Sequence, residues 1–125
     1  ILGGGAWRGA RVLSEESVAE MTRDQLDGLV VEEQPGAIPA WSNDFPLGAG
    51  QDGFGLGFQI SVGNDPGRRP PGTLSWAGIM NTHFWIDSQN DIGVVLLVQV
   101  LPFYDEKAVD LLSSFERALY TDPDA

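Results

Sequence analysis

The sequence contains a single histidine, His83, so any catalytic site that needs an imidazole base must use it. A Ser-His-Asp triad would combine it with a serine such as Ser75 and an acid such as Asp87. No G-x-S-x-G segment is present to expose a serine at a sharp turn. A lone histidine without spaced carboxylates on its element is also not a metal ligand set. We therefore interpret His83 as a satisfied structural histidine and expect no metal site.

Another kind of serine chemistry uses a lysine one helical turn after the serine, in an S-x-x-K motif, to take the serine proton. The only lysine is Lys107, and the residue three positions before it is Tyr104. Neither Tyr104 nor Tyr120 is followed two residues later by asparagine, so a Y-x-N motif is absent too. The sequence therefore carries no serine nucleophile with a matching base.

The composition is that of an acidic globular chain. Its 125 residues are 42% hydrophobic and 20% charged, which is typical of a folded single domain. A net charge of −11 repels phosphate backbones and anionic lipids, so we expect neither nucleic-acid nor membrane binding. The absence of cysteine excludes disulfides and thiol catalysis. No run approaches the roughly 20 apolar residues of a membrane span, and we expect a soluble protein.

The N-terminal third is predicted to contain one short helix. The first five residues, ILGGG, are typical of the last turn of a helix and its left-handed cap, although an ordinary flexible chain end is the alternative. Residues 13–25 are predicted to form an amphipathic helix, because Ser14 is a good N-cap and two glutamates follow in the first turn. Residues 28–52 are predicted to be a long loop. Trp41 and Phe45 would be costly to leave in water, so this loop should pack over another surface.

Residues 53–101 are predicted to form an antiparallel meander of three or four strands. Residues 53–62 alternate large apolar residues with small ones, which indicates a single strand. Strands are also expected over 73–77 and 81–87. The strand over 92–101 is apolar on both faces, which is typical of a central strand that is covered on both sides.

Residues 105–120 are predicted to form a helix that packs on the sheet, with Asp122 and Pro123 beyond its end. The fold class is therefore α+β, an antiparallel sheet flanked by helices. One helix of about four turns cannot cover both faces of such a sheet. We therefore expect residues 1–125 to be one segment of a larger domain, incomplete alone.

Several segments, in order, resemble the C-terminal third of β-lactamase-like serine hydrolases. This superfamily includes class C β-lactamases, family VIII-type carboxylesterases and penicillin-binding proteins. The segments are WRGARVLS at 7–14, GFGLGF at 53–58, GTLSWAG at 72–78, THFWID at 82–87, and 92–99 with the last helix. The resemblance covers most of the chain. It implies the C-terminal part of the β-lactamase/transpeptidase-like fold.

The resemblance also implies a site. In this family a K-T-G motif, or W-G-G in the esterase branch, lies on the strand that lines the active site. Trp76, Ala77 and Gly78 resemble the esterase form, with alanine in place of one glycine. These residues would bind substrate, and the backbone N–H of Ile79 would be an oxyanion-hole donor. From the residues alone, an aromatic and two small residues packed in a sheet is the alternative.

The implied function is part of a serine hydrolase that acts through an acyl-serine intermediate. Because Trp76 cannot supply the charge of a lysine, small acyl esters are expected as substrates. The S-x-x-K and Y-x-N residues would belong to an N-terminal part of the same hydrolase, present as a separate chain or removed, so this chain alone is predicted to be inactive. No cofactor is implied, and the compartment stays open between bacterial cytoplasm, periplasm and secretion. The alternative function is a non-catalytic binding or structural module derived from this fold.

Overall fold

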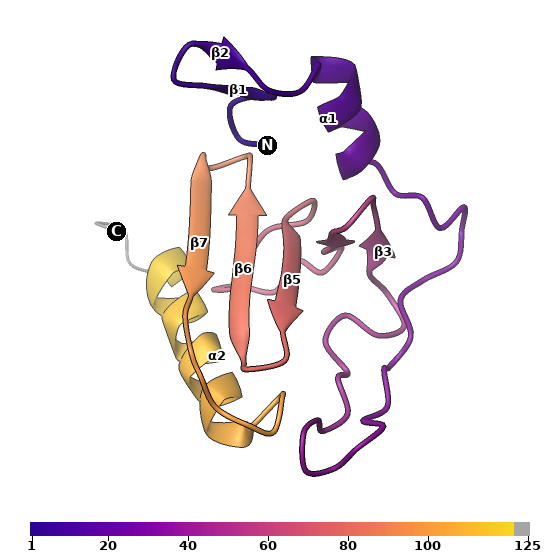
Figure 1. The fold of residues 1–125 in the computed structure, drawn as a ribbon, viewed down its shortest axis with the longest axis vertical. Coiled ribbons are helices and arrows are strands. Elements are labelled where there is room, and N and C mark those ends of the chain that lie inside the picture. The colour runs from indigo at the N-terminus through magenta and orange to yellow at the C-terminus, as the bar shows by residue number, and fades with distance from the viewer. Residues whose placement is uncertain (122–125) are drawn as a thin grey trace.

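A computed structural model of the chain describes residues 1–121, which form a five-stranded antiparallel sheet, a two-stranded hairpin and two α-helices (Figure 1). Each strand of the sheet pairs with its neighbour in the sequence, in the order β3-β4-β5-β6-β7. Their bounds are β3 (Gly53–Phe54), β4 (Gln59–Ile60), β5 (Leu74–Gly78), β6 (Thr82–Asp87) and β7 (Ile92–Leu96). The α+β class predicted from the sequence is confirmed.

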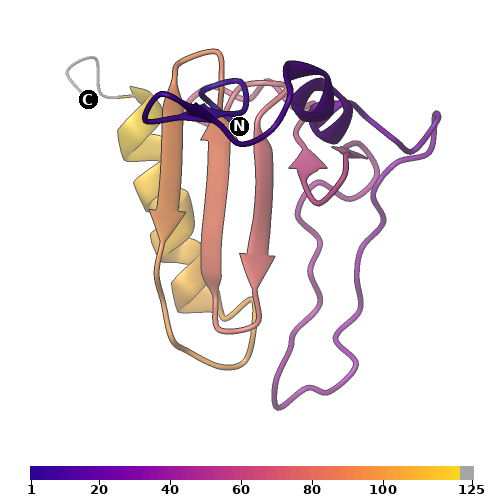
Figure 2. The ribbon, with the colours of Figure 1, turned by 45° about the horizontal axis from the view of Figure 1, so that its top comes forward.

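The chain begins with turns and a short hairpin instead of the expected helical end. Gly4 and Gly5 have φ values of 56° and 87°, which glycine adopts without steric cost. The hairpin consists of β1 (Ala6–Trp7) paired antiparallel with β2 (Ala10–Arg11). It lies near the end of the large sheet (Figure 2).

Helix α1 (Glu15–Thr22) is shorter than the predicted 13–25. Its N-terminus is as expected, because the Ser14 hydroxyl oxygen accepts a hydrogen bond from the Ser17 N–H at 3.0 Å. The helix ends because Arg23 is extended, with φ −78° and ψ 144°. No helix within residues 1–121 is long and apolar enough to cross a membrane.

The prediction of a single strand over 53–62 is wrong. Residues 55–58 form a tight turn between β3 and β4, closed by a 2.7 Å hydrogen bond from the Gly55 N–H to the Phe58 carbonyl. Gly57 adopts φ 93° in this turn. Gly55 is buried, and a Cβ placed there would lie 2.3 Å from the Met21 carbonyl oxygen. The small residues therefore serve a turn that packs against α1, and they do not form the second face of one strand.

Helix α2 (Glu106–Thr121) covers one face of the sheet (Figures 1 and 2). Trp85 of β6 is completely buried beneath it, with its ring centroid 5.8 Å from that of Phe115. The Trp85 indole N–H also donates to the Tyr120 hydroxyl at 3.1 Å. The packing of the last helix on the sheet therefore agrees with the sequence prediction. Asp122 and Pro123 lie outside the described residues.

Strand β7 is an edge strand within the described chain, so its prediction as a central strand is wrong here. It is also shorter than predicted, because its backbone pairing with β6 ends at Leu96, and beyond it the Val98 carbonyl accepts from the Thr82 hydroxyl at 3.1 Å. Val95 and Leu97 are 60% and 79% exposed on the face opposite α2. Large apolar side chains on that face therefore have no cover from residues 1–121.

The long loop packs partly on this chain itself. Gln34 and Phe45 form a β-bridge that closes the loop on itself. Phe45 is 6% exposed and contacts Phe103 just before α2, at a ring-centroid distance of 5.2 Å. Trp41 remains 59% exposed. The expected packing of the loop is therefore found for Phe45, which is buried against residues of this chain, and is not found for Trp41.

Candidate functional site

The four residues singled out by the sequence lie consecutively at one end of β5. Trp76 pairs with Phe84, and Gly78, the last residue of the strand, pairs with Thr82. Trp76 and Ala77 are half-buried, whereas Gly78 is exposed and Ile79 is 53% exposed. Because side chains alternate along a strand, position 76 and position 78 face the same side of the sheet. This arrangement forms a short, accessible wall that ends in a turn.

Two phenylalanines hold the Trp76 indole in place. Phe54 of β3 contacts it edge-on, with ring centroids 5.2 Å apart and planes at 89°. Phe45 of the long loop makes a second edge contact at 6.2 Å and 90°. Edge-to-face arrangements of this kind are favoured by the charge distribution of aromatic rings. Trp76 therefore presents a rigid, uncharged surface.

The turn after β5 exposes a backbone donor. The Ile79 N–H makes no hydrogen bond within the described residues. A Cβ added at Gly78 would meet Thr82 only at 3.9 Å, an ordinary van der Waals distance, so the space over Gly78 is open. A free N–H beside an open backbone position can donate to an oxygen that arrives from outside the chain. A free N–H is one requirement of an oxyanion-hole donor.

Asn81 positions this turn and was not identified as a site residue from the sequence. It is fully buried, with φ 62°, and its N–H donates to the Gly78 carbonyl at 3.0 Å. Its side-chain amide donates to the carbonyls of Val100 and Pro102, and its side-chain oxygen accepts from the Asp105 N–H. The sequence signal that could have identified it is an asparagine at the junction between two predicted strands, because asparagine tolerates positive φ and is common in turns.

The end of α1 positions Phe54. One carboxylate oxygen of Asp24 accepts hydrogen bonds from the N–H groups of Phe54 and Leu26, at 3.1 and 3.2 Å. The Gln25 N–H donates to the Phe54 carbonyl at 2.8 Å. The segment after α1 is therefore bonded directly to the strand residue that contacts Trp76.

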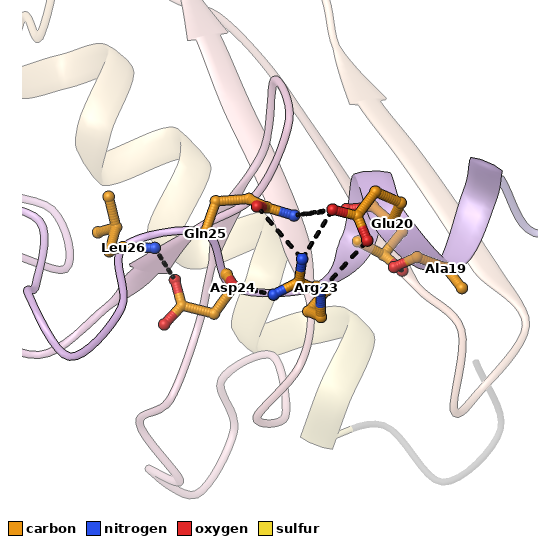
Figure 3. Close-up of polar contacts among 7 residues, drawn as sticks. Ala19, Glu20, Arg23, Asp24, Gln25 and Leu26 are labelled. Atoms are coloured by element: carbon orange, nitrogen blue, oxygen red, sulfur yellow. Dashed lines mark hydrogen bonds and ion pairs between the residues drawn. The ribbon is translucent and has the colours of Figure 1, made fainter. Parts of the chain in front are cut away.

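A polar cluster beside this junction fixes the path of the chain after α1 (Figure 3). The Arg23 guanidinium donates to the Glu20 carboxylate at 2.7 Å, and the Gln25 amide donates to the same side chain at 3.1 Å. These hydrogen bonds, that from Arg23 first, lower the pKa of Glu20. The cluster is exposed, so we assign it an orienting role and little stability.

The alternative triad is not assembled. His83, Ser75 and Asp87 make no hydrogen bond to one another within residues 1–121. The Asp87 carboxylate instead accepts from the Tyr120 hydroxyl at 3.1 Å and from the Asn90 amide at 2.7 Å. Asp87 therefore anchors α2 and a turn, and it does not orient an imidazole.

His83 is buried, but its hydrogen bonds are not all satisfied. It is 4% exposed and stacks on Phe103 at a centroid distance of 6.2 Å. Its Nε2 has no hydrogen-bond partner in the described chain, which corrects the expectation of a satisfied histidine. Burial, with a smaller contribution from the positive charge of Arg69, lowers the pKa of His83 to about 4. No group of three or more acidic or histidine side chains in residues 1–121 is placed to hold a metal ion.

Comparisons with known proteins give relatives in sequence and in fold. No protein-family model matches the sequence. Protein Rv1367c and Uncharacterized protein MT1414, from two strains of Mycobacterium tuberculosis, are each 32% identical to the chain over 109 residues. The match covers 82% of this chain and 25% of each relative. The chain therefore spans about a quarter of the length of these relatives.

Solved structures of simvastatin synthase (LovD) from Aspergillus terreus are similar over nearly the whole chain. The unliganded enzyme has a TM-score of 0.68 at 20% identity, covering 96% of this chain and 32% of that one. The LovD9 mutant has a TM-score of 0.67 at 19% identity, covering 97% and 32%.

The fold is the C-terminal part of a β-lactamase-like fold. At identities of 19–22%, this likeness concerns the fold alone. It agrees with the fold that the sequence segments predicted. The site assigned to Trp76, Ala77, Gly78 and Ile79 stays a prediction.

Proposed function

We propose that this chain forms one wall of the acyl-transfer site of a β-lactamase-like serine hydrolase that cleaves small acyl esters. Trp76, Ala77 and Gly78 contact the substrate. The backbone N–H of Ile79 donates to the oxyanion of the tetrahedral intermediate that forms when a serine attacks the ester carbonyl. The observation that carries the proposal is this unbonded N–H at an exposed turn, next to the open space over Gly78.

The uncharged surface at Trp76 supports an ester over a substrate that carries a carboxylate. No arginine or lysine side chain within residues 1–121 stacks on Trp76. The nearest basic pair in the sequence, Arg68 and Arg69, is bound to Glu116. A substrate that contacts this wall therefore gains from apolar packing and not from an ion pair.

The nucleophile and base come from a further part of the same hydrolase. The chain spans 32% of the solved simvastatin synthase chain, so the remainder of such a fold is about twice as long. The exposed side chains Val95 and Leu97 offer it an apolar surface. An interface of that kind is typical of obligate partners. The isolated 125-residue chain is inactive by this proposal.

Labelling with a fluorophosphonate probe tests the proposal. The chain is isolated from its natural source by size-exclusion chromatography and analysed by intact mass. We expect a tightly associated polypeptide of about twice this length that carries the labelled serine, whereas the chain alone is not labelled. An unlabelled homodimer would contradict the enzyme and support a non-catalytic module.

A substitution then tests the wall itself. Trp76→Ala is expected to change the rate of p-nitrophenyl ester hydrolysis, or the acyl-chain preference, of the intact assembly. Trp41→Ala is the matched control, because Trp41 is 59% exposed on the distal part of the loop. Equal effects of the two substitutions would count against the assigned site.

A further inference from the structure

An apolar groove lies beside the candidate site. It has a volume of about 760 Å³, within the range of small-molecule sites. Its apolar lining comes from the segment after α1 and from β3: Leu26, Leu29, Val30, Val31, Pro35 and Phe54.

The walls of the groove are held by hydrogen bonds. The Val31 N–H donates to the Asp52 carbonyl at 2.8 Å, and the Val31 carbonyl accepts from the Gly50 N–H at 2.8 Å. Val31 itself is 9% exposed, so it forms the floor, whereas Leu29 is 73% exposed at the opening. On the far side, Phe54 is fixed by Asp24 and Gln25. The groove is therefore a built feature of the fold.

Phe54 links the groove to the candidate site. Phe54 lines the groove and also contacts Trp76, with ring centroids 5.2 Å apart. A ligand that reacts near Ile79 and lies against Trp76 can place a further apolar part against Phe54. The two surfaces therefore suit a single extended ligand.

The charge of the lining selects the kind of ligand. Glu32 and Glu33 line the groove, and no arginine or lysine does. Neither glutamate takes part in an ion pair within the described residues. A carboxylate on the ligand would be repelled at this position, whereas an uncharged hydrocarbon chain would not.

We propose that this groove binds the apolar acyl chain of a neutral ester, and so sets the substrate class of the site at Trp76 to Ile79. The inference rests on the proposed function for the identity of the reacting group. The binding of a neutral alkyl chain can be measured without any reaction.

Two probes of equal chain length test the proposal on the protein as it is isolated from its natural source and, for comparison, on the 125-residue chain. Methyl octanoate is neutral and octanoate is anionic at pH 7. Titrations followed by the NMR shifts of the backbone amides of residues 26–35 are expected to show binding of methyl octanoate there. Octanoate is expected to bind about two- to fivefold more weakly, because the exposed carboxylates of Glu32 and Glu33 repel its own carboxylate. Glu32→Gln combined with Glu33→Gln is expected to reduce that difference.

An apolar variant with a matched control tests the lining. Leu29→Ser is expected to weaken methyl octanoate binding about tenfold, because the ligand loses an apolar contact. Ile38→Ser makes the same kind of change on the same loop outside the groove, and it is expected to have no effect. Leu29 and Ile38 are 73% and 50% exposed, so both variants should fold.

The outcomes separate this inference from the proposed function. If methyl octanoate does not shift residues 26–35, or if both serine variants weaken it equally, the groove proposal is wrong. It is also wrong if the probe binds the isolated chain but not the intact assembly, because a polypeptide segment then fills the groove. An assembly that is labelled by fluorophosphonate but hydrolyses acetyl and octanoyl esters equally well retains the proposed function and loses this inference. If the probe binds but fluorophosphonate does not label the assembly, the groove binds alkyl chains and the proposed enzymatic function is wrong.

Discussion

The side-chain amide of Asn81 donates a hydrogen bond to the Val100 carbonyl at 2.9 Å, and so joins the turn after β5 to the segment that leads into α2. The same amide group reaches the Pro102 carbonyl at 2.8 Å. The turn that exposes the Ile79 N–H is therefore braced by a residue whose own side chain is fully buried. Asn81 therefore fixes the backbone of this turn through its side chain.

Asn81→Ala is expected to lower the free energy of unfolding by about 2–3 kcal/mol, because it removes the donor to the part-buried carbonyls of Val100 and Pro102 and puts alanine at a positive φ. Asn81→Gly should lose less, since glycine tolerates that φ. Denaturant unfolding measures both. Asn64→Ala, an exposed substitution with no side-chain hydrogen bond in the described chain, is the control and should change stability by less than about 0.5 kcal/mol. Equal losses at positions 81 and 64 would contradict the bracing role.

A buried ion pair fixes α2 to the turn between β4 and β5. One carboxylate oxygen of Glu116 accepts from the Arg69 backbone N–H at 2.9 Å and from its Nε at 3.0 Å. Glu116 is completely buried, and Arg69 also lies over the ring of Trp85. Glu116→Ala is expected to cost about 3–5 kcal/mol, because it leaves a buried charge unpaired.

The matched control for Glu116 is Asp110→Ala, an exposed acid on the same helix. It should change the free energy of unfolding by less than about 0.5 kcal/mol. Both are measured by urea unfolding at pH 7. A loss at position 116 no larger than that at position 110 would mean that the ion pair adds nothing to the attachment of α2.

The elements that local sequence determines were predicted well. Ser14 is recognisable as an N-cap from its own type and the glutamates that follow, and its hydroxyl oxygen does accept from the Ser17 N–H. The last helix was predicted over 105–120 and covers Glu106–Thr121, because its apolar residues repeat with the helical period. Trp76 was placed on a strand beside Gly78, as the structure has it.

The failures have a common physical cause, which is contact between distant segments. The alternation over 53–62 fits a single strand, and it gives no sign that Gly55 packs against the carbonyl of Met21, a residue far away in the sequence. Apolar residues on both faces of β7 indicate burial on both faces, but the pattern does not say which residues supply it. Asn81 was predicted as the first residue of the strand over 81–87, but the structure places it in the turn, where its side-chain partners lie 19 to 24 residues away.

Gly55→Ala tests the contact between the β3–β4 turn and α1. The added Cβ would lie 2.3 Å from the Met21 carbonyl oxygen, so the turn or the helix must move. We expect a loss of about 1–3 kcal/mol in the free energy of unfolding, together with NMR shifts at Phe54 and Trp76. Gly63→Ala is the control, because its Cβ would meet only the Gln51 amide at 3.7 Å. Shifts confined to residue 55 and its immediate neighbours would show that the β3–β4 turn does not influence the position of Trp76.

The buried imidazole of His83 makes stability depend on pH in a defined window. Its pKa is about 4 in the folded chain, against an ordinary value of 6.5, so the folded state keeps the ring neutral where the unfolded chain protonates it. Between these two values the unfolded chain binds more protons, and stability therefore rises with pH. The contribution is complete above pH 6.5, and it is lost as the pH falls toward 4, by at most about 1.4 kcal/mol per pH unit.

Urea unfolding of the chain and of His83→Gln between pH 4 and 7.5 measures this dependence. Carboxylates titrate in the lower part of the same range, so the difference between the two curves isolates the histidine. We expect His83→Gln to be less stable at pH 7 because it loses the stacking on Phe103, and to lose less stability on acidification between pH 6.5 and 5. Parallel curves over that interval would show that the ring is protonated equally in both states. They would also show that His83 is less buried in solution than its 4% exposure indicates.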